Sequence, residues 1–174
     1  RWTGGMKGKK GTTDEGGVRS VCYIRWTAKI QAGGVVTQIA GAIDLMPTLT
    51  SLAGVKRVGD KPLDGRDLTP LLLKQPTEWA ERMIFSTWAG KISVRTQTHR
   101  LDGNGQLFDM IADPGQTKPL NEKEPMLSAK LADSVKAWRS EMFGAETIQA
   151  QAKGDKKKGT GNAVDQRPIP VGYR

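Results

Sequence analysis

A glycine- and lysine-rich segment, residues 3–17, holds most of the side chains in this sequence that could act on an anion. It contains six glycines and the three lysines Lys7, Lys9 and Lys10, and the hydroxyl groups of Thr12 and Thr13 lie directly after them. Glycine lets backbone N–H groups approach a ligand closely, and ammonium groups pair with sulfate or phosphate oxygens. The segment therefore indicates an anion site of sulfate or phosphate type, with a solvated loop as the alternative. It does not match the P-loop, because Gly8-Lys9 is followed by Lys10 where that pattern needs Ser or Thr.

The other reactive side chains lack catalytic partners in the sequence. Cys22 is the only cysteine, which excludes an internal disulfide, and we expect it to be a small core residue. His99, the only histidine, ends an expected hairpin and should lie on the surface. Asp14 and Glu15 are adjacent, so they do not converge as an acid–base pair. We expect Asp14 to face solvent and Glu15 to accept loop N–H bonds or to pair with Arg19.

An apolar strand and a helix follow the glycine-rich segment. Residues 18–26 are rich in β-branched and aromatic side chains, which predicts a buried strand entering a sheet. A helix is predicted after Asp44, which can cap free N–H groups, and it should end at Gly54. Its expected apolar face consists of Leu45, Leu49, Leu52 and Ala53.

The second half of the chain predicts a small antiparallel sheet and a helix. Residues 82–88 and 91–98 have the pattern of two strands joined by a tight turn, and residues 106–110 that of a third. A short helical turn is expected at 70–73. Residues 124–143 predict a helix with one apolar stripe, formed by Leu127, Leu131, Val135, Trp138 and Met142.

The net charge of +9 is concentrated at the two ends of the chain. Residues 1–32 hold seven Lys or Arg against two Asp or Glu, net +5, and residues 151–174 hold six against two, net +4. The residues between them are neutral overall. A nucleic-acid-binding module carries its basic stripe through the folded body, so we expect no nucleic-acid partner. No apolar run approaches the roughly 20 residues of a membrane helix, so we expect no membrane partner.

Four motifs, in order, resemble the formylglycine-dependent sulfatases (arylsulfatases) of the alkaline-phosphatase superfamily. Residues 10–19 read Lys-Gly-Thr-Thr-Asp-Glu-Gly-Gly-Val-Arg and are similar to the family's Lys-Gly-Thr-x-x-Glu-Gly-Gly-x-Arg segment. Residues 42–54 are similar to its Asp-x-x-Pro-Thr helix, and residues 63–66, Leu-Asp-Gly-Arg, to the loop that follows. The last match is Leu-Phe-Asp-Met at 107–110, with Asp113-Pro114. The resemblance covers about residues 7–143.

This resemblance implies an α/β fold: a C-terminal fragment of the sulfatase fold that ends in a small antiparallel sheet with a packed C-terminal helix. The 174 residues suffice for one ordinary domain or for parts of two. Residues 1–55 would be the last part of the main α/β domain. Residues 56–144 would be the C-terminal sheet subdomain with its helix, and residues 145–174 a basic linker or tail.

The resemblance also implies a chemistry, the hydrolysis of aryl or carbohydrate sulfate esters by a sulfuric ester hydrolase. Among the family's basic residues that contact the sulfate is the lysine of the Lys-Gly-Thr segment, here Lys10. Lys9 and Thr12 are weaker candidates for substrate binding. Formylglycine and one divalent cation, usually calcium, would belong to the whole protein. Neither site is expected in this chain, because Cys22 lacks the following Pro-x-Arg and no Asp or Glu precedes Lys10.

We therefore expect part of a sulfatase that is inactive and poorly soluble alone, from a protein that is periplasmic or extracellular. One alternative is a non-catalytic module that binds anionic polymers, such as sulfated glycans, through its basic ends. Another is a phosphatase or phosphodiesterase of the same superfamily, which a different nucleophile would distinguish.

Overall fold

The computed structural model describes residues 2–56 and 58–155, with the backbone alone for 145–155. The chain divides between Val135 and Lys136 into two compact units. This division lies elsewhere than the domain boundary near residue 55 that the sequence predicts. That boundary stays a prediction.

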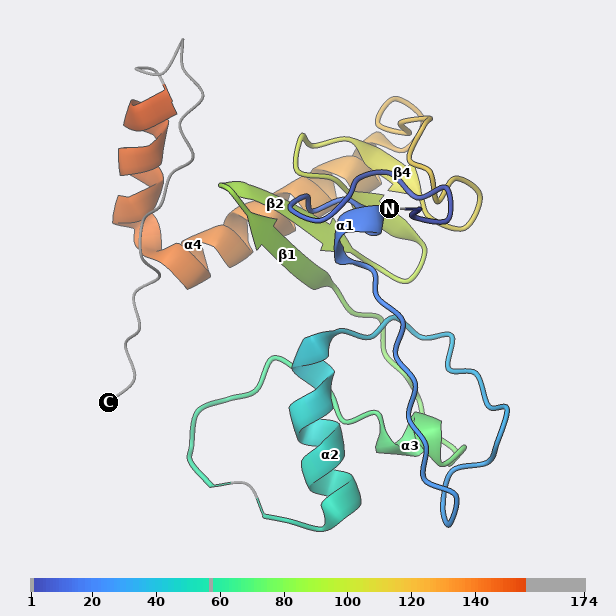
Figure 1. The fold of residues 1–174 in the computed structure, drawn as a ribbon. Coiled ribbons are helices and arrows are strands. Elements are labelled where there is room, and N and C mark those ends of the chain that lie inside the picture. The colour runs from blue at the N-terminus through green and yellow to red at the C-terminus, as the bar shows by residue number, and fades with distance from the viewer. Residues whose placement is uncertain (1, 57, 156–174) are drawn as a thin grey trace. The chain divides into compact units, whose positions relative to one another are not determined.

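A four-stranded antiparallel sheet lies in the first unit (Figure 1). Its spatial order follows the chain order: β1 (Ile84–Trp88), β2 (Lys91–Arg95), β3 (His99–Leu101) and β4 (Leu107–Asp109). The predicted hairpin is confirmed, and both turn residues, Ala89 and Gly90, have positive φ, as the twist of a two-residue hairpin requires. The sequence pattern did not show β3, so the predicted third strand is the fourth.

One face of the sheet carries the hydrophobic core. Successive side chains of a strand point to opposite faces. Val94, Leu101 and Leu107 are buried together with Leu131 of helix α4 (Pro125–Asp155). Leu127 and Val135 pack against this cluster, as the predicted helical stripe requires. In Figure 1 the first turns of α4 run behind the sheet.

The opposite face of the sheet carries polar side chains and the buried Phe108, and it lies under the glycine-rich segment. The last residues of this segment begin the single-turn helix α1 (Glu15–Val18). Ser93 and Arg100, each next to a core residue in its strand, contact Thr13 of this segment. The blue segment in Figure 1 crosses this face. The sheet is therefore covered by the helix on one side and by the glycine-rich segment on the other.

The predicted strand at residues 18–26 is wrong. Residues 19–26 form no helix or strand, and Val21 and Tyr23 are largely exposed. A strand needs a neighbouring strand to receive its backbone hydrogen bonds, and no segment in the described part of the chain pairs with this one. Cys22 is exposed rather than in the core.

Helix α2 (Leu45–Ala53) is confirmed and ends at Gly54, but its surroundings differ from the prediction. No side chain caps the N-terminus of α2. Asp44, the predicted cap, is the last residue of the 3-10 helix η1 (Ala42–Asp44). The residue that α2 buries is Thr48, whose hydroxyl accepts the N–H of Leu68 at 2.9 Å. Most of the expected apolar face is exposed: Leu45, Leu49 and Ala53 are exposed, and Leu52 is half-buried.

The Leu-Asp-Gly-Arg motif packs against a buried ion pair. The Asp44 carboxylate is fully buried and pairs with Arg82 at 2.8 Å. It also accepts the backbone N–H of Arg66 at 2.8 Å. A Cβ at Gly65 would lie 1.9 Å from the carbonyl oxygen of Ile43, so only glycine allows this approach. Helix α3 (Thr69–Leu72), the predicted helical turn, follows.

Helix α4 continues beyond the sheet into the second unit. It includes residues 145–155 of the predicted tail and has a non-helical residue at Gly144. Trp138, expected in the core, is half-buried and meets Phe143 edge-on, with ring centroids 6.0 Å apart. Residues 156–174 of the predicted tail lie outside the described residues. Among the helices that the structure describes, none has the length and apolar character to span a bilayer.

Replacing Leu131 by alanine should destabilise the sheet. Leu131 is fully buried between α4 and the strands, so truncation removes apolar contacts and leaves a cavity. We expect the full-length protein to lose about 2–5 kcal/mol of unfolding free energy, measured by urea denaturation. Met126→Ala, on the same helix but 83% exposed, should change it little. Equal losses in the two variants would contradict this packing.

The chain expressed alone should aggregate. Several large apolar side chains are more than half exposed, among them Val21, Tyr23, Val35, Met46, Leu49 and Val58. Such surface favours self-association. Size-exclusion chromatography should show soluble aggregates, whereas a monomer with a cooperative melt would refute this expectation.

Candidate functional site

A tight turn over residues 9–12 presents the two candidate lysines. The N–H of Thr12 donates to the carbonyl oxygen of Lys9 at 3.0 Å. The Thr12 hydroxyl donates to the same oxygen at 3.0 Å and accepts the N–H of Lys9 at 3.2 Å. Both lysines are exposed, and the Lys10 side chain makes no hydrogen bond or ion pair with any described residue. The structure therefore leaves the Lys10 ammonium available to a ligand.

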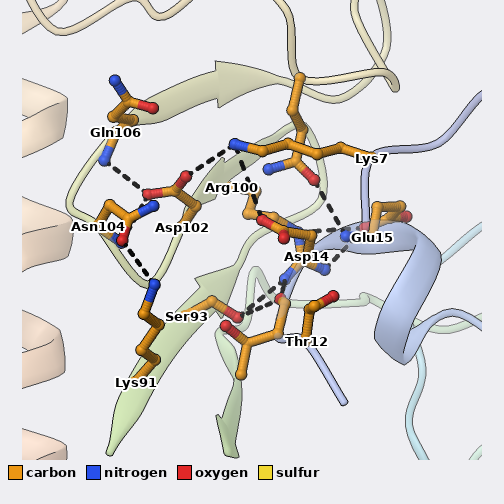
Figure 2. Close-up of polar contacts among 12 residues, drawn as sticks. Lys7, Thr12, Asp14, Glu15, Lys91, Ser93, Arg100, Asp102, Asn104 and Gln106 are labelled. Carbon is orange, nitrogen blue, oxygen red and sulfur yellow. Dashed lines mark hydrogen bonds and ion pairs between the residues drawn. The ribbon is translucent and has the colours of Figure 1, made fainter. Parts of the chain in front are cut away.

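The turn is anchored by a buried carboxylate, Glu15, only 5% exposed. Its closest partner is Arg100 on β3, with Nη2 2.7 Å and Nε 3.2 Å from Oε2 (Figure 2). Arg95 lies 3.5 Å away and the exposed Arg19 3.6 Å away. The predicted pairing with Arg19 is confirmed, but the shortest contact is one that the sequence did not show.

Arg100 ties the backbone of the turn to the sheet. Its Nη1 donates to the carbonyl oxygen of Thr13 at 2.9 Å, and the hydroxyl of Ser93 donates to the same oxygen at 2.8 Å. The N–H of Glu15 donates to Oε1 of the buried Gln116 at 3.0 Å. Thr13 and Glu15 directly follow the turn at residues 9–12. These bonds therefore fix the end of the turn on the sheet.

The Glu-Gly-Gly part of the motif is explained by close packing inside the loop. A Cβ at Gly17 would lie 2.2 Å from the carbonyl oxygen of Thr12 and 2.8 Å from that of Lys9. Helix α1 can therefore pack against the turn only because this position lacks a side chain. The motif is thus a structural requirement of the turn as well as a family signature.

Lys7 anchors the loop rather than binding a ligand. Its ammonium lies 3.2 Å from Oδ2 of Asp102, which is buried, and 3.9 Å from Oδ1 of Asp14. It also lies 5.0 Å from the ring centroid of Phe108. Asp14, expected to face solvent, is half-buried because the loop packs on the sheet.

Three guanidinium groups lie near the Glu15 carboxylate. Burial lowers the pKa of the Arg95 guanidinium, the Glu15 carboxylate raises it, and Arg100 and Arg19 lower it further. Arginine stays protonated in proteins, so three guanidinium groups lie near one carboxylate, while the ammonium of Lys7 lies near Asp102 and Asp14.

A cavity of about 200 Å³ lies beside the turn. Its walls are the loop residues Gly11, Thr12, Thr13 and Asp14, the end of the hairpin at Trp88, Ala89 and Lys91, and the β3–β4 turn at Gly103 and Asn104. Of the three predicted site residues, only Thr12 lines it. Lys9 and Lys10 precede its wall on the same turn.

The other sequence candidates do not join this site. His99 is half-buried rather than on the surface, because it belongs to β3, and its Nε2 lies 3.5 Å from Glu124. Within the described residues, no three His, Cys, Asp or Glu side chains gather in a set that could hold a metal ion. The side chains of the second basic end, residues 151–174, are outside the described part of the chain.

Several residues of the site could not be identified from the sequence. Arg100, Ser93 and Gln116 are far from the motif in the chain, and only the pairing of strands brings them under it. One signal in the sequence indicated that the sheet has a polar face. It is the alternation of polar and apolar residues in Ile92-Ser93-Val94-Arg95.

Replacing Arg100 by methionine should destabilise the protein strongly. The change leaves the buried Glu15 carboxylate without its closest partner, a loss of about 3–5 kcal/mol. The matched control is Arg19→Met, since that guanidinium pairs with the same carboxylate but is 62% exposed. It should cost about 1 kcal/mol or less. Urea denaturation of the full-length variants measures both, and equal effects would contradict the central place of Arg100.

Comparisons with known proteins identify sulfatases as relatives of this chain. No protein-family model matches the chain. Arylsulfatase A of Bos taurus is 36% identical over 138 residues, which cover 71% of this chain and 26% of the relative. Arylsulfatase A of Homo sapiens is 36% identical over 128 residues, 68% of this chain and 25% of the relative. Steryl-sulfatase of Mus musculus is 45% identical over 69 residues, 40% of this chain and 11% of the relative.

Solved structures share the fold. A Bacteroides thetaiotaomicron sulfatase from a study of glycosaminoglycan metabolism matches with a TM-score of 0.64 and 19% identity, over 79% of this chain and 32% of that one. Ps i-CgsB matches with a TM-score of 0.62 and 22% identity, over 88% of this chain and 37% of that one. The predicted α/β fold, with its antiparallel sheet and packed helix, is confirmed. The chain spans about a quarter of the length of the two arylsulfatases A, which fits the predicted partial match, and it belongs to the sulfatase family.

Proposed function

We propose that the protein containing this chain hydrolyses sulfate esters and that Lys10 contacts a sulfate oxygen in that reaction. The observation that carries the proposal is the exposed Lys10 ammonium, which has no partner among the described residues, on a turn tied to the sheet. The membership of the chain in the sulfatase family supports the reaction class.

The anchoring explains how a lysine on a loop could assist catalysis. Charged groups lower a barrier most when they are held in advance where negative charge develops. The buried pair of Glu15 with Arg100 holds the backbone of the turn, and the Thr12 hydroxyl closes it. Lys10 would then stabilise the sulfate oxygens, with Lys9 beside it as a second cation.

The residues described do not fit the family's nucleophile or its cation. Cys22 is followed by Tyr-Ile-Arg and lacks Pro-x-Arg, and no carboxylate set in the described part of the chain could hold a divalent ion. We therefore assign formylglycine and the cation, usually calcium in this family, to other parts of the whole protein, and no step is assigned to them here.

The substrate class that we propose is an aryl or carbohydrate sulfate, and the compartment is periplasmic or extracellular. The name arylsulfatase A supports an aryl sulfate, and the name N-acetylgalactosamine-6-sulfatase, that of a Mus musculus relative 43% identical over 76 residues, supports a carbohydrate sulfate. Cell fractionation of the full-length protein tests the latter, and recovery in the cytoplasm would refute it.

Lys10→Ala in the full-length protein should reduce kcat/KM for 4-nitrophenyl sulfate by about 10²–10³-fold, the cost of removing one preorganised charge contact. Unfolding free energy should stay within about 0.5 kcal/mol, because the side chain is exposed. Steady-state kinetics and urea denaturation measure the two quantities.

The matched control for this variant is Lys123→Ala, another exposed lysine of the first unit, placed just before α4. It should leave kcat/KM unchanged. A Lys10→Ala enzyme that keeps wild-type turnover, or a wild-type protein without sulfatase activity, would refute the proposal.

A further inference from the structure

We propose that the cavity beside the turn is a subsite for one sugar ring that bears an acidic group. The inference rests on the proposed function and specifies its substrate as a sulfated glycan. It assigns roles to Trp88, Lys91 and Asn104, which the sulfatase motifs do not include. The carrying observation is that an exposed aromatic side chain and a lysine line the same small cavity.

The hairpin register places the aromatic ring and the charge on one face. Trp88 and Lys91 are direct cross-strand partners at the end of the hairpin, and such partners project from the same face of a sheet. Ser93 lies two residues from Lys91, so it shares this face, and it holds Thr13 of the loop. Ser93 thus holds the loop on this face, and the cavity lies beside Thr13 and Lys91.

Lys91 supplies a cation without a carboxylate partner in the described part of the chain. Its ammonium contacts the neutral Oδ1 of Asn104 at 2.9 Å (Figure 2). Asp14, the acidic residue of the cavity wall, lies near the ammonium of Lys7 instead. An ammonium has three donors, so Lys91 can still bind a carboxylate or sulfate oxygen.

Trp88 supplies an apolar wall. It is 61% exposed, and its indole N–H has no hydrogen-bond partner among the described residues. Sugar rings present a face of C–H groups that packs on aromatic rings, and their hydroxyls accept hydrogen bonds from an indole N–H. Tryptophan suits a ligand that is apolar on one side and polar at its edge.

Two glycines of the cavity wall lie close to the two key side chains. A Cβ at Gly103 would lie 2.9 Å from Cβ of Lys91, and a Cβ at Gly11 would lie 3.6 Å from Nε1 of Trp88. The cavity volume of about 200 Å³ is below the roughly 300–1,000 Å³ of drug-sized pockets. The cavity therefore suits a single ring, and Gly11 directly follows Lys10, so an adjacent ring could carry the sulfate that is cleaved.

The test measures binding separately from turnover. Fluorescently labelled tetrasaccharides of chondroitin sulfate, dermatan sulfate and heparan sulfate are titrated with the full-length protein, and the Kd is read from anisotropy. For the best-binding probe, Trp88→Ala and Lys91→Gln should each raise the Kd by about tenfold or more, the loss of one contact to a charged or well-packed group. Trp88→Phe and Lys91→Arg, which keep the ring or the charge, should recover most of the affinity.

Three controls make the result decisive. Lys118→Ala, an exposed lysine outside the cavity wall, should leave the Kd unchanged. The substrate 4-nitrophenyl sulfate has no second ring, so its KM should change less in the Trp88 and Lys91 variants than the glycan Kd does. Urea denaturation shows whether each variant is folded, as expected for exposed positions.

The outcomes separate this inference from the proposed function. No measurable binding of any tetrasaccharide by the wild type, or a Kd that Trp88→Ala and Lys91→Gln leave unchanged, would overturn the subsite. An equal loss for Lys118→Ala would also overturn it, since binding would then follow net charge alone. Glycan binding that depends on Trp88 and Lys91 in a protein without sulfatase turnover would support the subsite while refuting the proposed function.

Discussion

The buried ion pair of Glu15 with Arg100 is the interaction on which the candidate site depends. Two charges removed from water are stable only when each is paired and hydrogen-bonded, and here Arg100 also binds the carbonyl oxygen of Thr13 and the hydroxyl of Ser93. These bonds join a loop with almost no apolar side chains to a sheet whose other face is the core. The contacts of Lys7 with Asp102 and of the Glu15 N–H with Gln116 add to this anchoring, and together they hold a glycine-rich loop that would otherwise be flexible.

The sheet connects this polar anchor to the core through the alternation of its strands. Ser93 and Arg100 face the loop, while their neighbours Val94 and Leu101 pack on Leu131 of α4. Packing of α4 on one face therefore fixes the positions of the residues that hold the loop on the other. The turn that carries Lys10 is in this way supported by the core, although Lys10 itself is exposed.

Local features were predictable from the sequence, and contacts between distant segments were not. The hairpin, helix α2 with its stop at Gly54 and the start of α4 follow from turn chemistry and periodicity. The two glycines of the Glu-Gly-Gly motif indicated close approach. Arg100 as the partner of Glu15 could not be predicted, since the two lie far apart in the chain and β3 is too short to show a pattern. The expected strand at residues 18–26 failed because apolar composition indicates burial but does not supply a neighbouring strand.

The central claim is that Arg100 acts on catalysis through the position of Lys10, and a double-mutant cycle tests it most directly. Arg100→Lys keeps the charge but loses the planar contacts to Thr13 and Glu15, so it shifts the turn. The cycle compares kcat/KM for 4-nitrophenyl sulfate in the full-length protein with Lys10→Ala, Arg100→Lys and both. We predict that Arg100→Lys reduces kcat/KM in the wild-type background and has little further effect once Lys10 is alanine. Fully additive losses would contradict the account, because Arg100 would then act independently of Lys10.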